Sequence, residues 1–250
     1  MKIACSSASF AREIAEGALT QLEWLDLCAN ELEVDGIVFD EAGFPRRDDE
    51  YCAQLKKLAA DLGLTVAAYA ARDVFAPGGE AALPAALALG APLVVATAPP
   101  ACEDVAAWGA FADVARERAG FAKALNVTLA VRNVEGTMCA SGSDLRRLAK
   151  DVDSAWLRFA SDPLGAGGPR ELDAILAKTV IAPCTIDPLA GFAAPGDTRA
   201  VTIIRALARF RGFIVLDSTG SDTGARTAYH EAVARFTGLR ATALDANPVP

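Results

Sequence analysis

Short apolar runs alternate with longer amphipathic stretches along the whole chain. The apolar runs predict eight strands, at Lys2–Cys5, Gly36–Asp40, Thr65–Ala70, Leu93–Thr97, Thr128–Asn133, Trp156–Ser161, Val180–Thr185 and Phe213–Asp217. Helical patterns lie between them, most clearly at Gln21–Leu32, Asp49–Leu62, Asp104–Leu125, Asp144–Val152, Arg170–Lys178, Thr198–Phe210 and Ala225–Phe236. A further helix near Gly79–Leu89 has the weakest pattern, because Pro84 lies inside it.

Strands that alternate with helices indicate parallel βαβ units. The 250 residues match the usual length of one TIM barrel, so we predict a single (β/α)8 TIM-barrel domain over residues 1–250, with residues 238–250 as a C-terminal tail. The alternative is an open doubly wound sheet, whose first turn is usually rich in glycine. Here that turn is Ser6-Ser7-Ala8-Ser9. The barrel predicts a functional site where the strands end.

The composition limits the possible binding partners and the cellular location of the protein. Hydrophobic residues make up 52% of the chain, enough for a large core, and the net charge of −8 argues against nucleic acid or an anionic membrane as a partner. No stretch reaches the ~20 apolar residues of a membrane span, and the opening MKIACSSASF lacks the apolar run of a signal peptide. The six cysteines form no CxxC pair, which favours reduced thiols and a cytoplasmic location.

The single histidine limits the chemistry further. His230 lies in the last predicted helix, where a lone histidine is usually a surface or packing residue. Histidine-based metal sites and catalytic triads are therefore not expected.

Charged residues stand where the later strands end. In NVTLAVRN the larger apolar residues alternate with smaller ones, so the larger set should face the helices and the smaller set should point into the barrel, with Arg132 at its top. An inward arginine needs acidic partners. Asp162, Asp187 and Asp217 follow the next three strands, each about one βα unit further on. The competing interpretation is that aspartates are common in loops and helix caps.

The sequence resembles the sugar phosphate isomerase/epimerase family, xylose isomerase-like TIM barrels that also include endonuclease IV. The N-terminal segment, from MKIACSSASF through LEVDGIVFD, is similar to the start of these proteins. NVTLAVRN resembles their fifth strand, FASDPLGAG their sixth-strand motif, and FRGFIVLDSTG their closing segment. The resemblance covers nearly the whole chain.

The resemblance implies a divalent metal held by Glu, Asp, His and Glu from strands five to eight. At those positions this chain has Arg132, Asp162, a site near Cys184 with Asp187 close by, and Asp217. A guanidinium is a permanent cation that cannot ligate Mg²⁺ or Mn²⁺. We therefore expect no cofactor, with a divalent metal such as Mg²⁺ or Mn²⁺ as the disfavoured alternative, and we hypothesise that Arg132 takes the cation's place, paired with Asp162 and Asp217.

The resemblance implies an isomerase or epimerase acting on a polyol, sugar or sugar phosphate, and it also implies a homodimer, because barrels of this family often pair. The alternative is a non-catalytic ligand-binding or interaction protein descended from that family. An endonuclease IV-like phosphoesterase is disfavoured by the acidic charge and the missing histidines. The candidate catalytic residues are Arg132, Asp162, Asp217 and Glu135. The candidate substrate-binding residues are Asp187, Cys184, Asn133, Asp40, Arg72 and Ser218.

The loop after the eighth predicted strand, residues 218–224, has two alternative interpretations. Loops after the last two strands of such barrels often bind phosphate at a helix N-terminus. Asp217 and Asp222 would weaken an anion site, and an ordinary capped turn explains the same residues.

Overall fold

Eight parallel strands close into a barrel in the computed structural model, which describes residues 2–102, 104–163, 169–186, 198–207, 210–218 and 225–245. The strands are β1 (Lys2–Ser6), β2 (Gly36–Asp40), β3 (Thr65–Ala71), β4 (Leu93–Thr97), β5 (Thr128–Arg132), β6 (Leu157–Ala160), β7 (Thr179–Ile186) and β8 (Phe213–Ser218). Each strand pairs with the next, and β8 returns to pair with β1. The predicted (β/α)8 barrel is confirmed, and the β1–β8 pairing excludes the open sheet.

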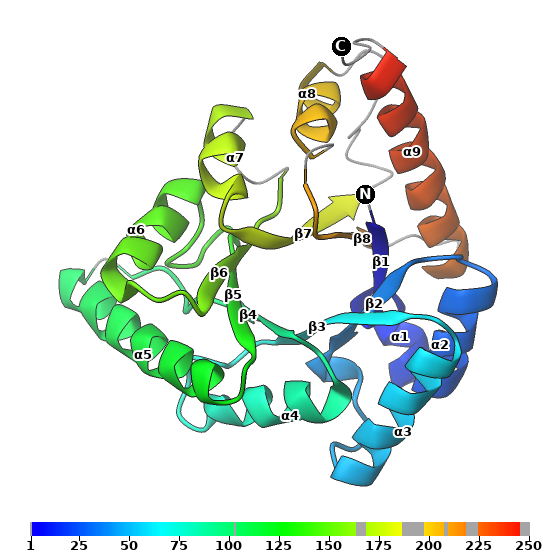
Figure 1. The fold of residues 1–250 in the computed structure, drawn as a ribbon, viewed down its shortest axis with the longest axis horizontal. Coiled ribbons are helices and arrows are strands. Elements are labelled where there is room, and N and C mark those ends of the chain that lie inside the picture. The colour runs from blue at the N-terminus through cyan, green and yellow to red at the C-terminus, as the bar shows by residue number, and fades with distance from the viewer. Residues whose placement is uncertain are drawn as a thin grey trace.

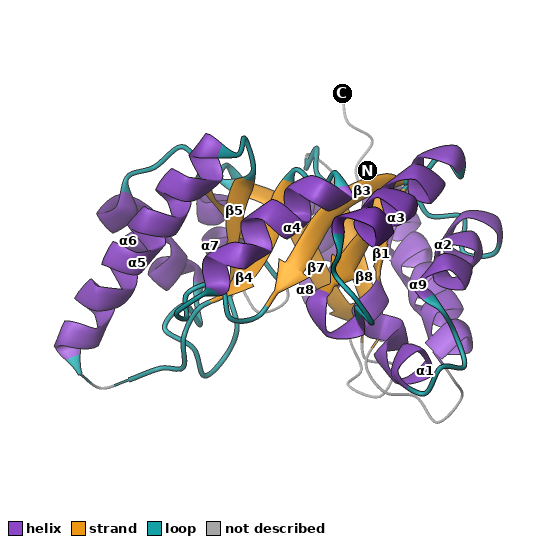
Figure 2. Cartoon of the chain, turned by 90° about the horizontal axis from the view of Figure 1, so that it is seen from below, coloured by secondary structure: helices purple, strands orange, loops and turns teal. Residues whose placement is uncertain are grey.

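Helices surround the strands (Figures 1 and 2). The α-helices are α1 (Ala11–Ala15), α2 (Gln21–Asn30), α3 (Asp49–Asp61), α4 (Ala82–Leu89), α5 (Val105–Ala124), α6 (Gly142–Val152), α7 (Pro169–Leu176), α8 (Thr198–Leu207) and α9 (Ala225–Asp245). Short 3-10 helices follow β1, β2 and the β3 loop, at η1 (Ser7–Phe10), η2 (Glu41–Gly43) and η3 (Gly79–Ala81). In the described ranges, no helix is both long and apolar enough to cross a membrane.

The core has two layers, and β5 shows how the sequence separates them. Leu129 and Val131 are fully buried in the large cluster between the strands and the helices. Ala130 belongs to the smaller cluster inside the barrel, so the predicted alternation is confirmed. Arg132 lies two residues beyond Ala130 on the same inward side, at the carboxyl end of the strand.

The opposite end of the barrel is closed by an aromatic ring. A Cβ added at Gly36 would lie 2.7 Å from a ring atom of Phe213 and 2.7 Å from the carbonyl oxygen of Thr65. Only glycine therefore lets the Phe213 ring pack across the start of β2.

Two helices differ from the predicted ones, and the helix with the weakest predicted pattern is confirmed. Helix α1 was not predicted, because five residues are too few to show a clear period. Helix α4 forms despite Pro84, which is its third residue and lies in the first turn, where a backbone N–H has no helical partner. Helix α9 continues past the expected end at Phe236 to Asp245, so residues 238–245 are helical rather than part of a tail.

Candidate functional site

Side chains from four separate strands meet at the carboxyl end of the barrel. Asp40 ends β2, Arg132 ends β5, Asp162 follows β6 and Asp217 lies in β8. The pKa of Asp217 responds to the charges of the other three, so the structure brings these four residues together. All four are half-buried. We call Asp40, Arg132, Asp162 and Asp217 the charged rim.

Asp217 has the most perturbed carboxyl group of the charged rim. Burial is the largest effect and raises its pKa from 3.8 to about 6, with Arg132 and a hydrogen bond from Ser9 acting in the opposite direction. Asp40 and Asp162 add to the increase through like-charge repulsion. Its Oδ1 atom is buried and accepts no hydrogen bond from any described residue. A carboxyl group with this pKa can hold or release a proton near neutral pH.

Asn133 holds the main chain at Asp162. The Asp162 N–H donates to Asn133 Oδ1 at 2.7 Å, and Asn133 Nδ2 donates to the Asp162 carbonyl oxygen at 3.3 Å. Asn133 is 5% exposed, and this pair of bonds extends the β5–β6 pairing by one step. These bonds give Asn133 a positioning role for Asp162, whereas the sequence suggested contact with substrate.

The serines after β1 support two members of the charged rim. Ser7 Oγ accepts a hydrogen bond from the Asp40 N–H at 2.8 Å, and Ser9 donates to Asp217. The Asp40 carboxylate in turn accepts from the Ala42 N–H at 3.0 Å, which fixes its orientation at the start of η2. Sequence analysis did not identify Ser7 or Ser9 as site residues. The only sequence feature that could have indicated them is the serine-rich turn after the first strand, where a nucleotide-binding sheet would have glycines.

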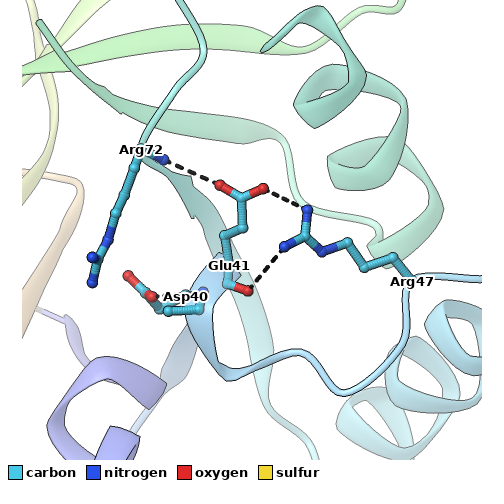
Figure 3. A network of polar contacts seen from close by, with 5 residues as sticks. Asp40, Glu41, Arg47 and Arg72 are labelled. Atoms are coloured by element: carbon cyan, nitrogen blue, oxygen red, sulfur yellow. Dashed lines mark hydrogen bonds and ion pairs between the residues drawn. The ribbon is translucent and has the colours of Figure 1, made fainter. Parts of the chain in front are cut away.

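Arg72 is anchored through its backbone. Its N–H donates to the Glu41 carboxylate at 3.2 Å, and the same carboxylate pairs with Arg47 (Figure 3). The guanidinium of Arg72 and the carboxylate of Asp40 point toward one another in that view. The Arg72 side chain is exposed and makes no hydrogen bond or ion pair with another described residue.

A cavity of about 530 Å³ opens at the end of β4 and is lined by Arg72, Thr97 and Thr137 among others, but by none of the four charged-rim residues. Thr97 is the register partner of Arg132, which places this cavity next to the strand end that carries the arginine. We call it the mouth cavity. Its volume is in the usual range for small-molecule sites.

The other candidates differ in how close they lie to the charged rim, and some fall outside the described residues. Cys184 is 4% exposed and lies close to the charged rim. Burial is the main cause that raises the pKa of its thiol, Asp162 and Asp217 raise it further, and Arg132 acts in the opposite direction. Glu135 is exposed on the loop after β5 and is not among the groups that act on Asp217. Asp187 and residues 219–224 lie outside the described residues, and Ser218 ends β8 with its side chain not described.

A metal ion needs a cluster of ligating side chains at the carboxyl ends of the strands. Within the described part of the chain, no group of three or more His, Cys, Asp or Glu side chains could hold one. Asp187 lies outside the described residues, so this finding applies only to the candidate metal ligands that the structure describes.

The fold matches several solved structures, whereas no family model and no curated protein matches the sequence. An L-ribulose 3-epimerase superposes with a TM-score of 0.78 at 17% identity, covering 98% of this chain and 96% of that one. A xylose isomerase-like TIM barrel protein from Mycobacterium smegmatis, solved with magnesium, gives 0.70 at 19%, covering 97% of each chain. The probable 3-DHS dehydratase AsbF from Bacillus anthracis gives 0.74 at 13% over the full length of both. This chain therefore shares the (β/α)8 fold of these proteins.

Proposed function

We propose that this protein is a sugar or sugar-phosphate isomerase or epimerase in which Arg132 supplies the positive charge that a divalent metal supplies elsewhere. The observation that carries the proposal is the charged rim, in which one arginine lies among three carboxyl groups at the strand ends. The similar fold of an L-ribulose 3-epimerase supports the reaction class. Fold alone does not select it, because a probable dehydratase has the same fold.

The residues present do not fit a divalent metal. Arg132 stands where the resemblance implies a glutamate ligand, and its guanidinium repels a cation and offers no lone pair. Asp217, at a second ligand position, has a pKa of about 6 and so carries a proton for part of the neutral range. We therefore assign no step of the reaction to a metal.

The proposed reaction moves a proton next to a carbonyl group. Arg132 donates hydrogen bonds to the carbonyl oxygen of the sugar and stabilises the negative charge that develops there. Asp217 removes the proton from the neighbouring carbon, and the electrons of the broken C–H bond move into an enediolate. The proton then returns to either carbon of that enediolate, and return to the opposite face gives the epimer.

Asp162 is the second acid/base group in this proposal. Its main chain is fixed by Asn133, so its carboxyl group can be held across the substrate from Asp217. Glu135 remains a prediction for the same role. Asp40 and Arg72 are proposed to bind the substrate, with the Arg72 guanidinium facing a phosphate where one is present. Ser218, Asp187 and Cys184 remain predicted contacts, and a homodimer in the cytoplasm without a nucleic-acid partner remains predicted.

Deuterium exchange tests the proposal. The purified protein, treated with EDTA, is incubated in D₂O with L-ribulose, D-fructose or D-fructose 6-phosphate, and the hydrogen next to the carbonyl is followed by proton NMR. We expect exchange with at least one of these sugars, and loss of exchange in Asp217→Asn. The control is Asp113→Asn, which removes an exposed carboxylate on α5. Exchange that disappears with EDTA and returns with Mn²⁺ would contradict the metal-free mechanism.

The alternative, a non-catalytic ligand-binding protein, predicts a charged cluster closed off from solvent. Arg132, Asp162 and Asp217 are half-buried rather than fully buried, and the mouth cavity opens at the end of β4, next to the strand that carries Arg132. This accessibility supports a site that receives a ligand. Saturable binding of a sugar without any deuterium exchange would favour the alternative over the enzyme.

A further inference from the structure

A second cavity lies outside the barrel, between α3 and α4. It measures about 470 Å³, and its lining includes Asp49 at the start of α3, the α4 residues Ala85 and Ala88, and Tyr69 of β3. Tyr69 faces the helices, whereas its neighbours Ala68 and Ala70 belong to the cluster inside the barrel. This α3–α4 cavity is therefore separated from the barrel interior by β3 itself.

Small side chains on one face of α4 leave the space open. Ala82, Ala85 and Ala88 are three residues apart, so they lie on one side of the helix, and all three line the cavity. Leucine at the half-buried Ala85 would project into this space. The cavity is thus a consequence of the sequence of α4.

Tyr69 brings an unsatisfied polar group to the α3–α4 cavity. The residue is 1% exposed, and its ring packs edge-on against Phe44 with centroids 5.8 Å apart. Among the described residues its hydroxyl finds no hydrogen-bond partner. The hydroxyl oxygen is not among the fully buried polar atoms, so it is open to a ligand in the cavity. Burial and the nearby Glu41 raise the pKa of Tyr69 well above its ordinary value, so the hydroxyl stays neutral and can both donate and accept.

The charges around the α3–α4 cavity are mainly negative. Glu41, Asp49 and Asp73 line it together with one cation, Arg47, and Arg47 pairs with Glu41. Asp49 and Asp73 are exposed and make no ion pair within the described part of the chain. Two carboxylates therefore remain uncompensated, and they make the potential at this cavity favourable for a cation.

We propose that the α3–α4 cavity binds a small organic cation with an apolar body. The apolar body packs against the alanines of α4, and the ammonium group donates a hydrogen bond to the Tyr69 hydroxyl in the field of Asp49 and Asp73. None of these residues belongs to the charged rim, and the site is shared with the mouth cavity only at Asp73, which lines both.

Three probes of one shape and different charge test the proposal: benzylammonium, benzyl alcohol and benzoate. Binding to the full chain is measured by ligand-observed NMR and titration calorimetry. We expect benzylammonium to bind with a Kd in the millimolar range or below, benzyl alcohol to bind about tenfold more weakly, and benzoate not to bind. Raising the salt concentration should weaken benzylammonium binding, because Asp49 and Asp73 are exposed.

Two variants locate the site. Tyr69→Phe removes only the hydroxyl and should weaken benzylammonium binding by about fivefold, and Ala85→Leu should abolish it by filling the cavity. Ala110→Leu, on the exposed face of α5, is the matched control and should leave binding unchanged. Equal binding of all three probes, no binding of benzylammonium, or unchanged binding in Tyr69→Phe would each overturn the proposal. Binding lost in Asp217→Asn instead would place the cation at the charged rim and would also overturn it.

Discussion

Replacing Asp217 by asparagine should change how the stability of the protein depends on pH. The pKa of Asp217 is raised from 3.8 to about 6 in the folded state, chiefly by burial. Below about pH 4 the carboxyl group is protonated in both the folded and the unfolded chain, so it has no unfavourable effect. As the pH rises through about 6, the folded state must ionise a group that burial disfavours, and stability is lost. Asparagine cannot ionise and avoids this loss.

The magnitude follows from the pKa. An increase from 3.8 to about 6 corresponds to about 3 kcal/mol between the two protonation states. Because the residue is half-buried and asparagine also loses the attraction of Arg132, the observed effect should be somewhat smaller. We expect Asp217→Asn and wild type to unfold with similar free energies near pH 4, and the variant to be more stable by about 2 kcal/mol at pH 8.

Urea unfolding followed by circular dichroism at several pH values measures this difference. Other carboxyl groups titrate in the same range, but they are common to both proteins and cancel in the comparison. Asp113→Asn, an exposed position, should run parallel to wild type throughout. Parallel curves for Asp217→Asn and wild type would show that the Asp217 pKa is close to its ordinary value, and the assignment of Asp217 as the proton carrier near neutral pH would fail.

Three further variants test other parts of the structure. Arg132→Glu should increase Mn²⁺ affinity at least about tenfold, as measured by calorimetry, because a carboxylate replaces the repelling cation; unchanged affinity would count against a replaced ligand. Asn133→Ala should lower the free energy of unfolding by about 1–3 kcal/mol, because the buried Asp162 backbone loses both partners; a thermal melt equal to wild type would contradict this. Arg118→Met should speed amide exchange around Val74, whose carbonyl accepts from the buried Arg118 Nε at 3.0 Å; unchanged exchange there would show that other contacts hold the loop.

The barrel could be predicted because the sequence shows the hydrophobic periodicity of strands and that of helices in alternation. In β5 the alternation of large and small residues separated the helix-facing side from the interior, and the structure has the same division. The ends of the helices were predicted less accurately. Gly238 was expected to lie beyond the last helix, yet α9 continues to Asp245, since one glycine costs an exposed helix only about 1 kcal/mol.

The positions of the charged rim could be inferred from strand spacing, but the connections between its members could not. Arg132 ends β5 and Asp217 lies at the end of β8, and each is about one βα unit along the chain from the next candidate residue. This spacing puts the candidates on one rim in any such barrel. The roles of Asn133 and Ser9 depend on which atoms meet across strands distant in sequence. Polar residues after a strand have no periodicity, so nothing in the sequence distinguishes a backbone contact from a substrate contact.

The charge of the rim supports the proposal that Arg132 takes the place of a glutamate ligand and its metal. A glutamate ligand and a divalent metal together carry a single positive charge, which is also the charge of a guanidinium. The three carboxyl groups of Asp40, Asp162 and Asp217 therefore face the same total charge in either arrangement. In the arginine arrangement, however, the cation is fixed to β5 and cannot move between the carboxyl groups. Burial raises the pKa of Asp217, whose Oδ1 has no hydrogen-bond partner among the described residues, and the attraction of Arg132 offsets only part of that increase. In the proposed metal-free site, Asp217 is therefore a carboxyl group able to exchange protons near neutral pH while Arg132 supplies the fixed positive charge.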